Sequence, residues 1–474
     1  MDEYELIVIG SGPAGEKAAV KAAYFGHKVA LIEKATQYGG AGVVTGTLPS
    51  KTLKETALYL SGRYDKGLYG VNRDIAGEAT VENFMYRKDL IIKTESEVVR
   101  ENLDLHKVDI YHGVATFEDP HTIRVKGAVE QTLKGDYIII ATGSYPFHPP
   151  NIPFDHNRVH DSDSILDIKR FPKTLAVLGA GVIGCEYATI FSTMGTKVFL
   201  INRTDKILSF IDQEIVQHLF ESMRHDQIEL LFNTGVKEIE VPTNEKENLK
   251  VTLESGAVLS VDMFLFAAGR NGNTEDLNLD KIGIERTKRH TIPVDANYRT
   301  SVPNIYAVGD VIGFPALAST SMDQGRVAVA HIFQTKDIEE LALVLPYGIY
   351  TVPEISTAGI TEEEAKAKNL SYNVGVAYHR DMPRGKIMGA EKGMLKLIFT
   401  RDDLVIRGAH VIGHLATELI HHGVDLIKAE KTLNDVIGKV YNFPTLHDLY
   451  KYAAYDGLSN MAGHKVKGLA FGTV

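Results

Sequence analysis

Residues 4–15 read YELIVIGSGPAG, and residues 174–184 read TLAVLGAGVIG. Each stretch is a short apolar run that ends in glycines with the spacing G-x-G-x-x-G. Such runs are typical of buried parallel strands, and the glycines allow a tight turn into a helix whose N-terminus can face phosphates. We therefore predict two strand, turn and helix units of the kind that binds a dinucleotide.

The pattern extends outward from both units. Helices are expected at residues 14–24 and 182–191, and further strands at 28–33, 137–140, 197–201, 263–266 and 305–308. From about Gly348 the pattern changes to TVPEISTAGI, GMLKLIFT and VIRGAHVIG, which indicate antiparallel strands, mixed with helices at 362–368 and 416–428. The sequence thus predicts an α/β fold with two Rossmann-like dinucleotide-binding domains and an α+β C-terminal domain. The expected boundaries are 1–150 and 276–346 for the first domain, 151–275 for the second and 347–474 for the third.

Length and composition exclude several classes of protein. The 474 residues suggest about three domains, and a net charge of −10 argues against a nucleic-acid binder. No run of 18 apolar residues is present, so no transmembrane helix is expected, and the acidic start MDEYE favours a cytoplasmic protein over a secreted one. No metal centre is expected. The single cysteine, Cys185, excludes any disulfide within the chain.

The residue at the end of the second strand of each unit selects the dinucleotide. Glu33 and Asn202 each lie 23 residues after the first glycine of their unit. A carboxylate there accepts a hydrogen bond from a free ribose 2′-hydroxyl and repels a 2′-phosphate, so Glu33 suits FAD or NAD. Asn202 is neutral and is followed by Arg203 and Lys206, which could pair with a phosphate. The alternative is that both cations are solvated surface charges.

Two further motifs accompany these units: Ala141-Thr142-Gly143 closes one strand, and YAVGD at 306–310 ends another. With the two units and these motifs, the chain resembles the flavin-dependent pyridine nucleotide-disulfide oxidoreductases. The likeness runs from about Tyr4 to about Asn460. Within the family it is closest to the soluble transhydrogenase branch, which passes hydride between NAD(H) and NADP(H) through FAD. The stretches that carry this likeness include HDSDSIL, GAGVIGCEYATIF, YAVGDVIGFPALAS, GIYTVPEIS and YNFPT.

The resemblance implies that the first unit binds FAD, that the second binds NAD(H) or NADP(H), and that the C-terminal domain forms a homodimer. It also implies that Asp310 holds the ribityl chain of FAD and that residues 113–115 line the adenine. Residues expected to bind a cofactor are Gly10, Gly12, Pro13, Ala14, Gly15, Glu33, Lys34, Lys51, Val114, Ala115, Thr142, Gly143, Gly179, Gly181, Val182, Ile183, Gly184, Glu186, Asn202, Arg203, Gly269, Arg270, Asp310 and Ala318.

Parts of the family's redox site are missing from this chain. Disulfide reductases of the family carry Cys-x4-Cys just before Pro-Ser-Lys, and here Gly42 and Thr47 occupy the two positions. The transhydrogenases usually keep the first cysteine, so Gly42 departs even from them. Phe443 replaces the histidine that precedes Pro-Thr, and a phenyl ring cannot exchange a proton. We expect Gly42 to leave space beside the flavin, and we expect neither His447 nor Cys185 to take over the lost chemistry.

Two other residues of the site are retained. The resemblance places Lys51 beside flavin N5 and Glu186 as its ion-pair partner, in contact with the nicotinamide, and both are expected to be catalytic. Taken singly, each could be an ordinary helix residue, since a glutamate in a first turn is favoured by the helix dipole. The expected function is FAD-dependent hydride transfer between NADP(H) and NAD(H) without a redox disulfide. The alternatives are an NAD(P)H diaphorase or quinone reductase, and a flavoprotein-derived binding subunit without catalysis.

Overall fold

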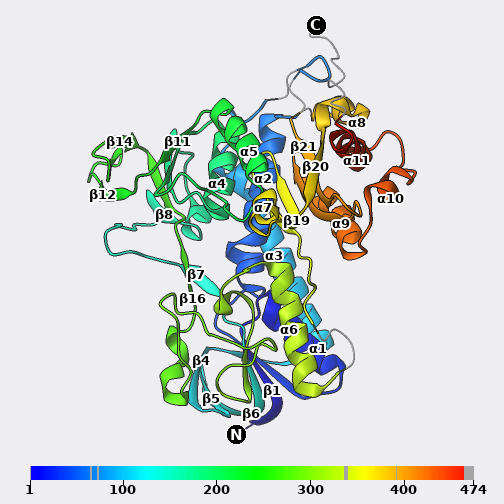
Figure 1. Cartoon of the computed structure of the whole chain (residues 1–474). Helices are drawn as coiled ribbons and strands as arrows, with labels where there is room; N and C mark the ends of the chain where they lie inside the picture. Colours follow the sequence, from blue (N-terminus) through cyan, green and yellow to red (C-terminus); the bar gives the residue numbers. More distant parts are fainter. Residues whose placement is uncertain (1, 65–66, 72–73, 336–339, 391, 464–474) are drawn as a thin grey trace. The chain divides into compact units, whose positions relative to one another are not determined.

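The computed structural model describes residues 2–64, 67–71, 74–335, 340–390 and 392–463, and contacts divide the chain into two compact units (Figure 1). The first consists of Met1–Leu53, Val81–Lys169 and Ala268–Ala342. The second consists of Lys54–Thr80, Arg170–Ala267 and Leu343–Val474. The three domain boundaries expected from the sequence, after residues 150, 275 and 346, remain a prediction.

A seven-stranded sheet forms the centre of the first unit. Its order is β3-β2-β1-β6-β5-β4, and β17 also pairs with β6. The strands β3, β2, β1, β6 and β17 run parallel, whereas β4 and β5 are antiparallel additions. The strand bounds are β1 Asp2–Ile9, β2 Val29–Glu33, β3 Asp109–His112, β4 Val114–Asp119, β5 Thr122–Lys126, β6 Glu130–Ile140 and β17 Ile305–Ala307.

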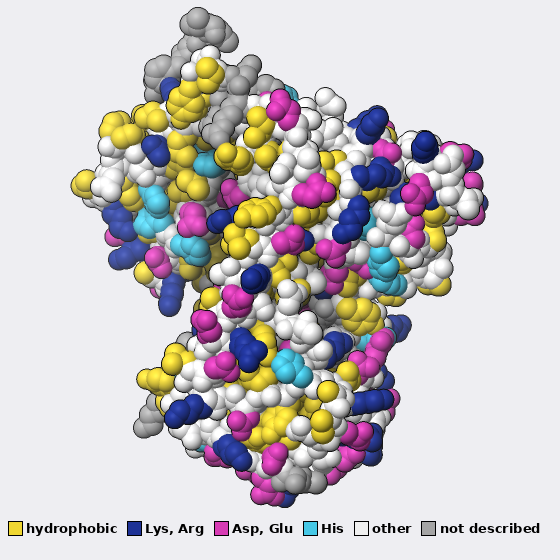
Figure 2. Space-filling view, turned by 180° about the vertical axis from the view of Figure 1, so that it is seen from behind, with side chains coloured by type: hydrophobic (Ala, Val, Ile, Leu, Met, Phe, Trp, Pro, Cys, Tyr) yellow, Lys and Arg dark blue, Asp and Glu magenta, His cyan; other side chains and the backbone are white. Residues whose placement is uncertain are grey.

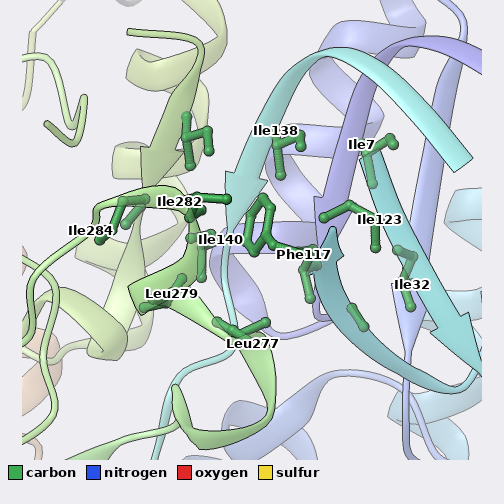
Figure 3. Close-up of a cluster of buried hydrophobic side chains, with 14 of the residues drawn as sticks. Ile7, Ile32, Phe117, Ile123, Ile138, Ile140, Leu277, Leu279, Ile282 and Ile284 are labelled. Atoms are coloured by element: carbon green, nitrogen blue, oxygen red, sulfur yellow. The ribbon is translucent and has the colours of Figure 1, made fainter. Parts of the chain in front are cut away.

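The centre of this sheet is buried on both faces, which explains why β2 and β17 are buried throughout and almost entirely apolar. On one face, Phe117 and isoleucines of the strands pack against Leu277, Leu279 and Ile282 (Figure 3). On the other face lie helices α1 (Pro13–Tyr24) and α6 (Ala318–Phe333), which run side by side in Figure 1. Gly325 allows this close approach, because a Cβ there would lie 2.3 Å from the Ala14 carbonyl oxygen.

The second unit contains a parallel sheet in which β11, β10, β9 and β15 lie in this order. Helices α4 (Val182–Thr193) and α5 (Gln213–His225) follow β9 and β10. A separate antiparallel sheet has the order β12-β13-β14. The strand bounds are β9 Thr174–Leu178, β10 Lys197–Asn202, β11 Ile228–Phe232, β12 Val236–Glu240, β13 Leu249–Leu253, β14 Val258–Val261 and β15 Met263–Phe266.

The C-terminal part of the second unit is an antiparallel sheet of order β18-β19-β22-β21-β20, packed against helices. The strand bounds are β18 Tyr347–Ile349, β19 Ile355–Gly359, β20 Tyr372–Tyr378, β21 Met394–Thr400 and β22 Ile406–Ile412. The helices are α7 Glu362–Ala367, α8 Pro383–Ile387, α9 Ala416–Lys428, α10 Leu433–Ile437 and α11 Asp448–Met461. The predicted α/β fold with an α+β C-terminal part is therefore confirmed. Helix α2 (Thr47–Ser61) carries Lys51, whereas helix α3 (Val81–Leu105) is not among the elements predicted from the sequence.

Charged side chains are distributed in two different ways. Lys and Arg are interspersed with Asp and Glu on the face shown in Figure 2. In contrast, Lys396 in β21 is buried, and its Nζ donates to Asp212 Oδ1 at 3.0 Å and to Glu362 Oε2 at 2.7 Å. Burial alone would lower the pKa of Lys396, but its carboxylate partners raise it. Within the described part of the chain, no helix is both long and apolar enough to cross a membrane.

Acidic pH is expected to destabilise the C-terminal part through His379. Burial lowers the pKa of this imidazole to about 4, below the value of about 6.5 in an unfolded chain. The unfolded state therefore binds the proton first, and stability is lost as the pH falls from about 6.5 towards 4. His379 should contribute about 2 kcal/mol of this loss between pH 7.5 and 5. Urea unfolding of the full-length protein at pH 7.5 and at pH 5 measures this change in the free energy of unfolding. An equally steep loss in the His379→Asn variant would contradict the assignment.

Candidate dinucleotide-binding sites

The first glycine turn joins β1 to α1. Gly10 has φ +104°, and a Cβ there would lie 2.5 Å from the Ala141 carbonyl oxygen. A Cβ on Gly15 would lie 1.9 Å from the Gly10 carbonyl oxygen, so both positions require glycine. At Gly12 a Cβ would meet only the Gly40 Cα, at 4.0 Å, among the described atoms. Pro13 then begins the helix, so this turn presents backbone N–H groups that suit a phosphate.

Glu33, at the end of β2, also holds this turn. The carboxylate is buried, and its Oε2 accepts hydrogen bonds from Ser11 N at 2.9 Å and from Ser11 Oγ at 2.6 Å. Its Oε1 accepts from Ala35 N at 2.8 Å. A carboxylate offers about four lone-pair positions, so one position on Oε1 remains for a ribose hydroxyl. Lys34 next to it forms an exposed ion pair with Asp276 at 3.7 Å.

Further predicted residues follow β6, which pairs with β1, and β17, which pairs with β6. Strand β6 pairs with both β1 and β17, so the segments after these strands lie at the same edge of the sheet. The Oγ1 of Thr142 is buried without a hydrogen-bond partner among the described residues, and a Cβ on Gly143 would meet no described atom within 4 Å. Asp310 Oδ2 accepts from Ser144 Oγ at 3.0 Å. This edge therefore combines an orphaned hydroxyl, open space and an oriented carboxylate, which suits a polyhydroxylated cofactor.

Arg270, another residue predicted to bind a cofactor, has several partners within the protein. Arg270 follows Gly269 and donates through Nε to Ser144 Oγ at 2.9 Å and through Nη1 to Ser162 Oγ at 3.0 Å. It also forms an ion pair with Asp163 at 3.3 Å. It thereby orients the serine that holds Asp310. The other predicted residues of this unit lie on regular elements, with Val114 and Ala115 in β4 and Ala318 as the first residue of α6.

The segment that replaces the redox pair is a short π-helix, Ala41–Thr45, followed by α2 from Thr47. A Cβ on Gly42 would lie 2.6 Å from Pro13 Cγ. A side chain at position 42 would therefore meet the proline ring, while the expected space beside the flavin remains a prediction. Lys51 lies further along α2, and its Nζ is 3.2 Å from Ser50 Oγ.

The second glycine turn joins β9 to α4 in the second unit and has a similar geometry. Gly179 has φ +106°, and a Cβ on Gly184 would lie 1.8 Å from the Gly179 carbonyl oxygen. A Cβ on Gly181 would meet no described atom within 4 Å. Val182 and Ile183 then form the first turn of α4. The turn therefore leaves open space at a helix N-terminus, where a pyrophosphate can approach the backbone.

Cys185 is fully buried behind this turn. Its Sγ lies 3.5 Å from the Ala180 carbonyl oxygen, and burial, together with Glu186, raises the pKa of the thiol. Because only the thiolate is a strong nucleophile, this sulfur is not suited to redox exchange. Glu186 is also buried, and its Oε1 accepts the Tyr350 backbone N–H at 2.9 Å. Lys51 belongs to the first unit and Glu186 to the second, and their pairing remains a prediction.

Asn202 and Arg203, the residues predicted to contact the 2′-group of the adenosine ribose, lie at the end of β10. Asn202 Oδ1 accepts from Ala180 N at 3.2 Å, and its Nδ2 donates to the Thr204 carbonyl oxygen at 3.0 Å. Arg203 is 74% exposed and pairs with Glu254, with 3.0 Å between Nη2 and Oε1. Glu254 could not be predicted from the sequence, because it lies 51 residues further along the chain than Arg203 and no motif marks it.

Phe443 is exposed, whereas His447 is packed among aromatic side chains. Phe443 is 77% exposed. The His447 ring lies among aromatic rings, with centroids 6.3 Å from Tyr441 and 6.4 Å from Tyr450, and burial lowers its pKa. Within the described residues, no group of three or more potential metal ligands is close enough to hold an ion.

Comparison with family models and curated proteins gives a consistent result. A model described as pyridine nucleotide-disulphide oxidoreductase matches residues 4–325, and the dimerisation domain of the same family matches residues 345–454. A soluble pyridine nucleotide transhydrogenase from Mycobacterium tuberculosis is 42% identical over 466 residues, which cover 97% of this chain and 98% of that protein. One from Pseudomonas putida is 39% identical over 471 residues, covering 97% and 99%.

Two solved structures are also similar to this chain. The Cu(II) complex of the HOCl-induced flavoprotein disulfide reductase RclA from Escherichia coli has a TM-score of 0.85 and 26% identity, covering 96% of this chain and 99% of that one. LpdA from Mycobacterium tuberculosis has a TM-score of 0.87 over the same fractions and, at 24% identity, supports the fold.

Proposed function

Since the chain belongs to the pyridine nucleotide-disulphide oxidoreductase family, whose enzymes use FAD and NAD(P)H, we propose that it passes hydride between NADP(H) and NAD(H) without a redox disulfide. The observation that carries this proposal is the combination of two dinucleotide turns with a segment that contains no thiol. Gly42 and Thr47 occupy the cysteine positions, and the only cysteine is buried behind the second turn. Relatives named soluble pyridine nucleotide transhydrogenase support the same reaction.

In this proposal the first unit holds FAD. The flavin supplies the hydride chemistry when it is bound. Backbone N–H groups at the start of α1 face the pyrophosphate, and Glu33 accepts a ribose hydroxyl at the free position of Oε1. Asp310, oriented by Ser144, accepts a hydroxyl of the ribityl chain. Thr142 Oγ1, which has no described partner, provides one more hydrogen bond to the cofactor.

The second unit positions the nicotinamide nucleotide. Its pyrophosphate would face the start of α4, beside Gly181, while Asn202 and Arg203 contact the adenosine ribose. Glu186, held by the Tyr350 N–H, would pair with Lys51. In this role Lys51 would place a positive charge beside the flavin, which becomes negatively charged on reduction. Glu186 would keep the Lys51 ammonium charged and oriented.

The residues matched by the dimerisation model support a homodimer as the functional form. A quinone acceptor is the second candidate, because the same reductive half-reaction could supply it with electrons. The ring of Pro13 argues against extra room for such an acceptor at position 42, since a Cβ built on Gly42 would lie 2.6 Å from Pro13 Cγ. Transhydrogenation is therefore the preferred function.

A steady-state assay with NADPH as donor and thio-NAD as acceptor tests the proposal. Purified, FAD-loaded protein should reduce thio-NAD, and a parallel assay should show slower reduction of a quinone. Faster turnover with the quinone would favour the diaphorase alternative. No reduction of FAD by either NADPH or NADH would instead favour the binding subunit.

Lys51→Met tests the residue assigned to the flavin. Loss of one charge-assisted hydrogen bond, worth about 1.5 to 3 kcal/mol, should slow flavin reduction by NADPH about 10- to 150-fold. Stopped-flow absorbance measures this rate. The control is Lys93→Met, which removes an exposed charge on α3 and should leave the rate unchanged. Equal rates in both variants would show that Lys51 does not act on the cofactor.

A further inference from the structure

The arginine expected to bind a 2′-phosphate already has a carboxylate partner. Arg203 follows β10, and its Nη2 donates to Glu254 Oε1 at 3.0 Å. Both side chains are accessible to solvent, with 74% of Arg203 and 46% of Glu254 exposed. A ligand can therefore reach this pair, but the arginine that it meets is already paired with a carboxylate.

The backbone around Glu254 holds its carboxylate at this place. Glu254 directly follows β13, and its N–H donates to the Gly235 carbonyl oxygen at 2.9 Å. The next residue, Ser255, donates its N–H to Thr234 Oγ1 at 3.2 Å. A Cβ added to Gly235 would lie 2.7 Å from the carboxylate, which shows how closely the Glu254 side chain covers that glycine. The hairpin between β13 and β14 thus presents the acid to the segment after β11.

This segment adjoins the ribose-recognising end of the parallel sheet. Thr234 N donates to the Asn202 carbonyl oxygen at 3.2 Å, which links the segments that follow β10 and β11. In doubly wound sheets ligands bind at the carboxyl ends of the strands, and the residue at the second strand end contacts the adenosine ribose. Glu254 therefore lies where an adenosine 2′-substituent would approach.

We propose that Glu254 is a specificity-determining residue that weakens binding of a 2′-phosphate by holding Arg203. This inference rests on the proposed function, in which the second glycine turn binds a nicotinamide nucleotide. A 2′-phosphate must share Arg203 with a like-charged carboxylate, whereas a neutral 2′-hydroxyl meets no such repulsion. Glu254 thereby shifts the balance of an enzyme that uses both nucleotides towards NAD(H).

Calorimetric titration of FAD-loaded protein with 2′,5′-ADP and with 5′-ADP tests this role. Glu254→Gln should lower the Kd of 2′,5′-ADP about five- to tenfold and change that of 5′-ADP by less than about twofold. Because the pair is exposed, the gain should shrink between low and high salt. An unchanged Kd for 2′,5′-ADP, or equal changes for both ligands, would overturn the proposal.

Two further variants separate this effect from a general change in charge. Glu240→Gln is the matched control, because this substitution removes the same charge. Glu240 pairs with Lys250 at 3.5 Å in the three-stranded sheet β12-β13-β14. The substitution should leave both Kd values within about twofold. In an Arg203→Ala background the gain from Glu254→Gln should disappear, and a full gain there would contradict action through Arg203.

The two ADP fragments carry no nicotinamide, so their binding does not depend on hydride transfer. A protein that fails the transhydrogenation assay can still show the predicted selectivity. If neither fragment binds the wild-type protein, both the nucleotide site and the role of Glu254 are wrong.

Discussion

Gly181→Val should weaken binding of NADH and NADPH at least about 100-fold while the protein stays folded and loaded with FAD. Gly181 has φ −79° and ψ −171°, an extended conformation that valine adopts readily. A Cβ there would meet no described atom within 4 Å, so the fold tolerates the side chain. The same side chain would occupy the space through which a pyrophosphate approaches the backbone at the start of α4. Calorimetry with each nucleotide, together with the flavin absorbance and the melting temperature, measures all parts of this prediction.

Gly184→Val provides the contrast. A Cβ on Gly184 would lie 1.8 Å from the Gly179 carbonyl oxygen, so valine there should disrupt the second unit itself. Its melting temperature should fall strongly, whereas that of Gly181→Val should remain near the wild-type value. Unchanged nucleotide binding in a folded Gly181→Val protein would show that the pyrophosphate lies elsewhere.

Dihydrolipoamide, oxidised glutathione and mercuric ion should not be turned over by the wild-type protein. Their reactions in this family need a pair of cysteines, and Gly42 and Thr47 provide no sulfur. Cys185 cannot substitute, because its thiol is fully buried and has a raised pKa. A rate clearly above the buffer blank, measured with each substrate and purified protein, would contradict the site assignment.

Anaerobic titration followed by absorbance provides a second test of the same point. The protein should take up two electrons per FAD, show no long-wavelength thiolate-to-flavin band, and remain active in arsenite. Uptake of four electrons would mean that a thiol reaches the flavin. We also expect the Gly42→Cys, Thr47→Cys double variant to gain little disulfide reductase activity, because a Cβ at position 42 would collide with Pro13.

The regular elements could be predicted wherever one local rule was enough. The strand Met263–Phe266 and the helix Ala416–Lys428 have the predicted bounds, because each is a single apolar or amphipathic run. In contrast, Lys396 interrupts an apolar strand, and its burial depends on Asp212 and Glu362 from distant segments. No local pattern could predict that the strand tolerates a buried charge.

For the candidate sites the division is similar. The sequence by itself determined the two glycine turns, the acid at Glu33, the neutral Asn202 and the loss of both redox cysteines, because covalent spacing along one strand, turn and helix sets these positions. The tertiary structure alone decided that Pro13 fills the place beside Gly42 and that Glu254 holds Arg203. These contacts join segments separated by 29 and 51 residues. Their geometry depends on how helices and hairpins pack, and spacing in the sequence does not encode it.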